Sequence, residues 1–209
     1  CLGSINLVKF VKDGDVDRER LASLVHLAVR FLDDVIDAGK YPVAMIEDIS
    51  KANRKIGLGV MGFAHMLIAL GIPYDSADAL KMAGSVMGLI QEESKKASRD
   101  LAGERGAFPN YRGSIWEGRG LPQRNATTTT IAPTGTLSII AGTSSGIEPV
   151  YDTEYSRIIF GGLKVHVLDP LYEQMKDTVD PSSLKKLFRK AHDVSPDWHL
   201  AIQKAFQDH

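Results

Sequence analysis

Apolar residues recur along this chain at two spacings, one typical of strands and one typical of amphipathic helices. The segment Leu2–Val11 is rich in apolar and β-branched residues and ends at the turn signal Asp13-Gly14, so a strand is predicted there. A helix capped by Asp17 is predicted to follow and to run to about Ala38. The predicted buried stripe of this helix comprises Leu21, Leu24, Val25, Ala28, Leu32, Val35 and Ile36.

The middle of the chain continues the alternation of strand and helix patterns. The predicted elements are, in order, a connector from Pro42, a strand at Lys55–Val60, a helix at Phe63–Leu70, a helix from Ser76 or Asp75 to about Ala102, and a loop at Glu104–Gln123.

The last third begins with a β-branched strand at Thr127–Ala132, a helix after Pro133 and a strand at Tyr155–Phe160. Three helix starts then share one design, in which a capping residue precedes a proline at the first helical position. They are Asp169-Pro170, Asp180-Pro181 and Ser195-Pro196. Strands that alternate with helices predict an α/β architecture with largely parallel strands.

Composition narrows the class of protein. The 209 residues are 44% apolar and carry a net charge of -1, which suits one core and does not indicate a surface for nucleic acid. The sequence contains no apolar run that could span a bilayer and no signal peptide, so a cytoplasmic protein without a membrane partner is expected. The single cysteine, Cys1, excludes an internal disulfide and a multi-cysteine metal site, and no metal ligand is predicted.

One glycine motif allows two interpretations. Gly57-Leu-Gly-Val-Met-Gly62 matches the dinucleotide-binding pattern G-x-G-x-x-G, which would indicate an NAD(P)-dependent dehydrogenase. The preceding strand candidate is short, and the motif lies well inside the chain. In the other interpretation, the glycines permit close packing of a helix on a strand.

The stretch Asn125–Pro149 carries the strongest functional signal. After the strand Thr127–Ala132, a turn at Pro133 leads into a short helix whose free N–H groups, from Gly135 to Ser138, would form an anion site without lysine. The residues assigned to phosphate binding are Pro133, Thr134, Gly135, Thr136, Leu137 and Ser138. A plain strand, turn and helix with a polar cap is the alternative, and a noncatalytic phosphate-binding interaction module is a further functional alternative.

Three segments, taken in order, resemble the large subunit of ribonucleotide reductases. They are Cys1-Leu-Gly-Ser-Ile-Asn-Leu7, Asn53–Ala64, which contains the glycine motif, and Arg124–Pro149. The first is similar to a family segment written Cys-Asn-Leu-Gly-Ser-Ile-Asn-Leu, with one residue missing after Cys1. The Pro-Thr-Gly-Thr spelling at Pro133–Thr136 is most similar to the adenosylcobalamin-dependent class that reduces ribonucleoside diphosphates.

This resemblance implies a fold, a reaction and roles for individual residues. The implied fold is the C-terminal part of a ten-stranded α/β barrel, with residues 1–209 forming a single partial domain. The implied reaction replaces the ribose 2′-hydroxyl with hydrogen by thiyl-radical chemistry, with adenosylcobalamin as cofactor and a thioredoxin-type reductant. Pro133–Ser138 would bind the substrate phosphate, and Cys1 would be one member of the redox-active cysteine pair.

The resemblance also implies that this polypeptide is part of a larger chain. The family's catalytic pattern Asn-x-Cys-x-Glu does not occur in this sequence. The chain is therefore expected to need the remainder of the reductase and to be inactive alone. Strand edges left open in a partial barrel are expected to cause self-association.

Overall fold

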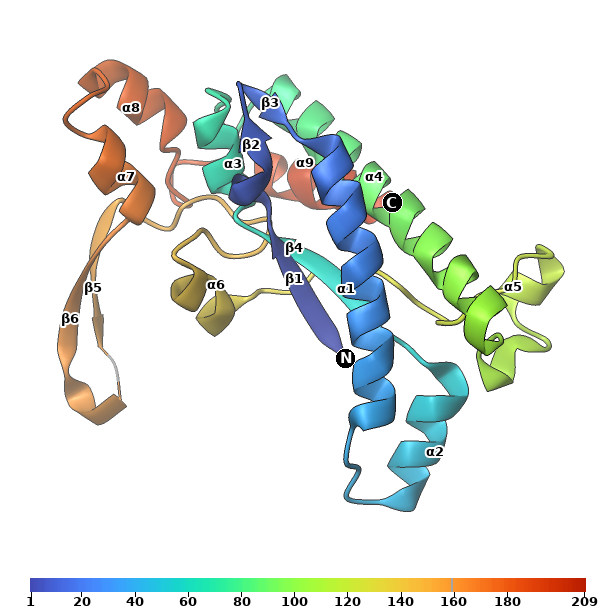
Figure 1. The fold of residues 1–209 in the computed structure, drawn as a ribbon. Helices are drawn as coiled ribbons and strands as arrows, with labels where there is room; N and C mark the ends of the chain where they lie inside the picture. Colours follow the sequence, from blue (N-terminus) through green and yellow to red (C-terminus); the bar gives the residue numbers. More distant parts are fainter. Residues whose placement is uncertain (159) are drawn as a thin grey trace.

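The computed structural model describes residues 1–158 and 160–209 of the chain (Figure 1). The strands are β1 (Leu2–Asn6), β2 (Val11–Lys12), β3 (Asp15–Val16), β4 (Gly57–Met61), β5 (Glu154–Ile158) and β6 (Lys164–Leu168). The α-helices are α1 (Arg18–Ala38), α2 (Ala44–Asn53), α3 (Phe63–Ala69), α4 (Ala77–Arg105), α5 (Ile115–Gly118), α6 (Gly135–Ala141), α7 (Pro170–Met175), α8 (Pro181–Leu187) and α9 (Pro196–Gln207). Short 3₁₀ turns cover Leu7–Phe10, Pro109–Tyr111 and Phe160–Gly162.

A pair of parallel strands lies at the centre of the fold. Strand β1 pairs with β4 in register from Leu2 opposite Gly57 to Asn6 opposite Met61. Helices α1 and α4 pack on each other along one side of this pair, and α9 packs against α4 (Figure 1). The β2–β3 and β5–β6 pairs are antiparallel hairpins. The predicted α/β class is confirmed. The central strand pair is parallel as predicted, but the prediction of largely parallel strands is wrong for β2–β3 and β5–β6, because neighbouring strands joined by a short turn pair antiparallel.

Most predicted helices form close to their expected bounds. Asp17 caps α1 by accepting a hydrogen bond from the Arg20 amide at 3.0 Å. The three proline starts open α7, α8 and α9, and the side chains of Asp169 and Asp180 accept amide hydrogen bonds as predicted. Ser195 makes no such side-chain bond. All three helices therefore begin with the predicted proline, and two of them also have the predicted side-chain cap.

The structure differs from the sequence prediction in the lengths and number of several elements. The strand predicted over Leu2–Val11 ends at Asn6, because a 3₁₀ turn buries Leu7 and Phe10 together. The connector predicted from Pro42 contains α2, which buries none of its residues. The predicted loop Glu104–Gln123 holds α5 and one 3₁₀ turn. The strand predicted over Tyr155–Phe160 is seen as β5 to Ile158, residue 159 lies outside the described residues, and β6 was not predicted.

The free edge of β1 predicts self-association. Within the described ranges, β1 pairs only with β4, and its first residue, Leu2, is 71% exposed. Unpaired strand edges pair readily with other chains. Sedimentation across a concentration series should show a shift toward larger species, which Leu2→Lys should weaken because an edge charge opposes pairing. A monomer at every concentration would contradict this expectation.

Among the described residues, none of the helices is both long enough and apolar enough to cross a bilayer.

Candidate functional site

The polypeptide that leads into the predicted phosphate loop is anchored at Asn125, which is fully buried. The Asn125 side-chain amide donates to the Asp33 carboxylate at 2.9 Å and to the Arg54 carbonyl at 3.1 Å. The Asn125 backbone amide donates to the hydroxyl of Ser98 on α4 at 3.0 Å. The start of the segment is therefore fixed to α1, to α4 and to Arg54, the residue that follows α2.

Asp33 is the centre of a buried charge cluster. Its carboxylate accepts hydrogen bonds from Arg54 at 2.8 Å, from Arg124 at 3.2 Å and from Arg105 at 3.3 Å. Arg54 also forms a bidentate pair with Asp37 at 2.8 Å, and this hydrogen bond holds the pKa of Asp37 below its usual value. Asp33 and Arg54 were not predicted as site residues from the sequence. The available signal was a carboxylate at position 33, inside the apolar stripe of α1.

The segment Thr127–Ala132 runs beside β4 but forms only part of the predicted strand. Its backbone forms three hydrogen bonds with β4 and with Ile56, the residue before β4. The Ile56 amide donates to the Thr127 carbonyl at 3.1 Å, and the Leu58 amide donates to the Thr128 carbonyl at 2.8 Å. The Thr130 amide donates to the Leu58 carbonyl at 3.2 Å. One parallel bridge joins Leu58 and Thr129. Two threonine hydroxyls are held by α4, Thr128 by Ser94 at 2.9 Å and Thr129 by Gln91 at 2.7 Å. The hydroxyl-rich sequence therefore serves to attach this segment to a helix.

The turn after this segment places Thr134 in the left-handed region, with φ of 53°. The Thr134 hydroxyl accepts a hydrogen bond from the Gly146 amide at 2.8 Å. Helix α6 then begins at Gly135, and the amides of Gly135, Thr136 and Leu137 have no acceptor within residues 1–158 and 160–209. Amides at a helix start that lack an internal acceptor form a site suited to an anion.

Ser138 differs from the prediction in detail. Its amide donates to the Thr134 carbonyl at 2.7 Å, so it belongs to the helix and is not a free donor. Its hydroxyl is buried and contacts the Gly135 carbonyl at 3.1 Å and the Ser145 hydroxyl at 2.9 Å. Thr136, by contrast, is exposed. The open donors at this helix start are thus three amides and the Thr136 hydroxyl. Ser138 instead connects the helix to the loop that follows it, through Ser145.

The glycines of the dinucleotide-like motif are explained by close packing. A Cβ at Gly59 would lie 2.9 Å from the Thr130 carbonyl oxygen, and one at Gly57 would lie 2.7 Å from the Leu2 side chain. Gly62 has φ of 75°, and a Cβ there would lie 2.6 Å from both Asn6 and Thr143 side-chain oxygens. These contacts are what the packing interpretation requires.

The first turn of α3, where a dinucleotide phosphate would sit, is already occupied by the chain itself. The Gly62 amide donates to the Ser144 carbonyl at 2.8 Å, and the His65 amide donates to the Ser144 hydroxyl at 3.3 Å. The Phe63 amide lies 3.5 Å from the Gly146 carbonyl. This geometry does not support the dehydrogenase interpretation.

Cys1 lies at the amino end of β1 and is exposed. Its carbonyl accepts a hydrogen bond from the Gly57 amide at 2.9 Å. The first turn of α3, by contrast, follows the carboxyl end of β4, where it contacts the loop after α6. Because β1 and β4 are parallel, Cys1 and this loop lie toward opposite ends of the strand pair.

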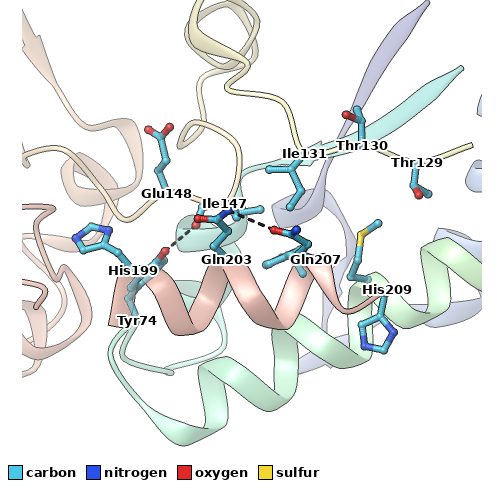
Figure 2. Close-up of a pocket in the computed structure, with 12 residues that line it drawn as sticks. Tyr74, Thr129, Thr130, Ile131, Ile147, Glu148, His199, Gln203, Gln207 and His209 are labelled. Carbon is cyan, nitrogen blue, oxygen red and sulfur yellow. Dashed lines mark hydrogen bonds between the residues drawn. The ribbon is translucent and has the colours of Figure 1, made fainter. Parts of the chain in front are cut away.

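A cavity of about 730 Å³ lies between α9 and the residues Thr129–Ile131 (Figure 2). Tyr74 and Glu148 line it at one end and His209 at the other (Figure 2). The Tyr74 hydroxyl donates to the Ile147 carbonyl at 2.8 Å, and burial, with the nearby Glu148 charge, raises the pKa of Tyr74. Tyr74 therefore acts as a fixed donor that holds the chain after α6. Gly135, Thr136 and Leu137, which carry the open amides of α6, do not line this cavity.

Comparison with known proteins gives a consistent result. The family model described as "Ribonucleotide reductase, barrel domain" matches residues 1–209. The vitamin B12-dependent ribonucleoside-diphosphate reductases of Thermoplasma acidophilum and Mycobacterium tuberculosis (strain H37Rv) are 48% and 43% identical to the chain, over 99% and 100% of it. The ribonucleoside-diphosphate reductase subunit alpha of Chlamydia muridarum is 31% identical over 95% of the chain. The chain spans 30%, 32% and 25% of the lengths of these relatives, respectively.

Proposed function

Because the chain belongs to the ribonucleotide reductase family and matches its barrel-domain model over residues 1–209, we propose that the protein containing it converts ribonucleoside diphosphates to deoxyribonucleotides. The higher identity to the B12-dependent relatives than to the Chlamydia subunit alpha agrees with the resemblance drawn from Pro133–Thr136. The relatives' names supply the substrate, a ribonucleoside diphosphate, and the nucleotide-reducing activity.

Within that reaction, the segment Pro133–Ser138 binds the phosphates of the substrate. The observation that carries this proposal is the start of α6, where the amides of Gly135, Thr136 and Leu137 have no acceptor among the described residues. A substrate held by its unreactive phosphate end presents its ribose in a fixed position, which is how binding geometry lowers a reaction barrier. No lysine or arginine is needed, since the amides and the helix dipole supply the positive potential.

Cys1 is proposed as one member of the redox pair that supplies electrons. Reduction of the 2′-carbon releases the 2′-hydroxyl as water and consumes two electrons. Two cysteine thiols supply these electrons and are oxidised to a disulfide. The sequence contains no second cysteine, so the partner thiol must come from the remainder of the reductase. A thioredoxin-type dithiol then reduces the disulfide by exchange at an accessible sulfur. The chain alone is therefore not expected to turn over nucleotides.

Adenosylcobalamin, when bound, would supply the initial radical. The buried histidine among the described residues, His65, is not available as a cobalt ligand, because both of its ring nitrogens already have hydrogen-bond partners. Its Nε2 lies 2.8 Å from the Asp169 carboxylate and its Nδ1 lies 3.3 Å from the Thr143 hydroxyl. No contact with the cofactor is assigned to this chain, and the proposed roles of the loop and of Cys1 do not depend on one.

Titration of the chain with ADP and CDP tests the phosphate site. Gly135→Val should weaken binding at least tenfold, about 1.4 kcal/mol, because a branched side chain blocks approach to the open amides. A Cβ at Gly135 meets no protein atom within 4 Å, so the fold should tolerate the change.

Gly118→Val, at another open glycine, is the matched control and should bind as the unchanged chain does. Adenosine, which lacks phosphate, should bind weakly to all three proteins. Equal affinity of the Gly135→Val variant and the unchanged chain for ADP would contradict the assignment. Binding of NAD by the unchanged chain would favour the dehydrogenase instead.

A further inference from the structure

A buried histidine outside the proposed phosphate site connects three parts of the fold. His65, in the first turn of α3, is 2% exposed. Its Nε2 lies 2.8 Å from an oxygen of Asp169, the residue that caps α7. Its Nδ1 lies 3.3 Å from the hydroxyl of Thr143, in the loop that follows α6. Asp169 and Thr143 thus bind opposite nitrogens of one ring.

Asp169 determines which nitrogen of a neutral His65 ring carries the proton. The Asp169 carboxylate accepts hydrogen bonds from the amides of Leu171 and Tyr172 through its other oxygen, both at 3.0 Å. A carboxylate only accepts hydrogen bonds, so the His65 Nε2 must donate to it. The Nδ1 of the neutral ring is then an acceptor, and it is positioned to receive the Thr143 hydroxyl proton.

The loop of residues 143–146 connects this histidine to the phosphate-binding segment. On one side, Ser144 accepts hydrogen bonds from the amides of Gly62 and His65. On the other side, the Gly146 amide donates to the Thr134 hydroxyl at 2.8 Å, and the Ser145 hydroxyl lies 2.9 Å from that of Ser138. The start of α6 is therefore held in place by a loop that is itself held by α3.

We propose that His65 is a positioning residue for the phosphate-binding segment, acting through its Nδ1 contact with Thr143. This inference rests on the proposed function of Pro133–Ser138 and adds a group that does not touch the substrate. The contact fixes the loop of residues 143–146, and this loop holds Thr134 and Ser138 through hydrogen bonds. It therefore sets the direction of the three open amides at the start of α6. The Nε2 contact with Asp169 orients the ring and stabilises the cap of α7.

Two substitutions at position 65 separate these contacts. In His65→Asn, a polar atom can take the place of Nδ1 and reach Thr143, whereas in His65→Gln the polar atoms take the place of Nε2 and reach Asp169. We expect the Gln variant to lose about tenfold in affinity for ADP and the Asn variant to stay within about threefold of the unchanged chain. Thr143→Val should match the Gln variant, and Thr143→Ser should restore binding.

The thermal midpoints of the variants distinguish positioning from a general loss of stability. A histidine that only fills the core predicts that affinity for ADP follows the midpoint, with Asn and Gln equally affected. Equal ADP affinity of the Asn and Gln variants would overturn the inference, as would unchanged affinity in Thr143→Val.

A readout without ligand separates this inference from the proposed function. If the unchanged chain binds no ADP, the proposed function fails. The inference still predicts that the backbone amide resonances of Gly135, Thr136 and Leu137 shift in His65→Gln and Thr143→Val, and stay in place in His65→Asn. Shifts of equal size in the Asn and Gln variants would overturn the positioning role.

Discussion

Replacing Asp33 with alanine is expected to lower the free energy of unfolding by about 3–5 kcal/mol, the range found when one partner of a buried ion pair is removed. Asp33 is fully buried and accepts hydrogen bonds from Arg54 at 2.8 Å and from Asn125 at 2.9 Å. Without it, the Arg54 guanidinium, in a residue that is 4% exposed, keeps only the half-exposed Asp37 as a carboxylate partner among the described residues. The Asn125 anchor of the phosphate-binding segment loses an acceptor in the same step.

The adjacent carboxylate provides a matched control. Asp34 also pairs with an arginine, Arg105, but its side chain is 52% exposed. Exposed pairs contribute at most about 1 kcal/mol, so Asp34→Ala should cost no more than that. Urea unfolding of the two variants gives the comparison directly, and equal losses would show that the Asp33 cluster does not hold the fold as described.

Gly62→Ala is expected to cost about 2–4 kcal/mol of unfolding free energy, because conformational and steric penalties combine. Gly62 has φ of 75°, which disfavours any residue with a Cβ. The added carbon would also lie 2.6 Å from the side-chain oxygens of Asn6 and Thr143. Since Thr143 belongs to the loop behind α6, the substitution should also weaken binding of ADP.

Gly71 separates the two penalties. Its φ is 73°, nearly that of Gly62, but a Cβ there would meet no atom within 4 Å. Gly71→Ala should therefore cost only about 1–2 kcal/mol, the conformational part. Thermal or urea unfolding that gives the same loss for both variants would mean that close packing at Gly62 has no energetic weight.

The sequence predicted those elements whose signals are local. Caps and prolines at helix starts act within a few residues, so α1 and α7–α9 were placed correctly. Helix α2 was missed because its apolar residues, among them Met45 and Ile49, are exposed in the structure and mark no core stripe. Thr127–Ala132 has strand-forming residues, but its pairing depends on β4, which lies some 70 residues earlier.

The candidate site also has a part that was predicted from local sequence and a part that was not. The turn at Pro133 and the short helix after it were predicted, because a glycine and small polar residues at a helix start are a local pattern. The buried network behind them was not predicted, since His65 and Asp169 are 104 positions apart and Asp33 and Asn125 are 92 apart. Ser138 belonged to the predicted list, yet only the fold shows that its hydroxyl faces Ser145.

The start of α6 is proposed to bind the phosphates of a nucleoside diphosphate. A ¹H–¹⁵N correlation spectrum of the chain, recorded during titration with ADP, tests this claim at the atoms concerned. The amide resonances of Gly135, Thr136 and Leu137 are expected to move first and furthest, and adenosine is expected to leave them in place. Shifts that centre on Gly57–Gly62, or no shift at the three amides when ADP is bound, would contradict it.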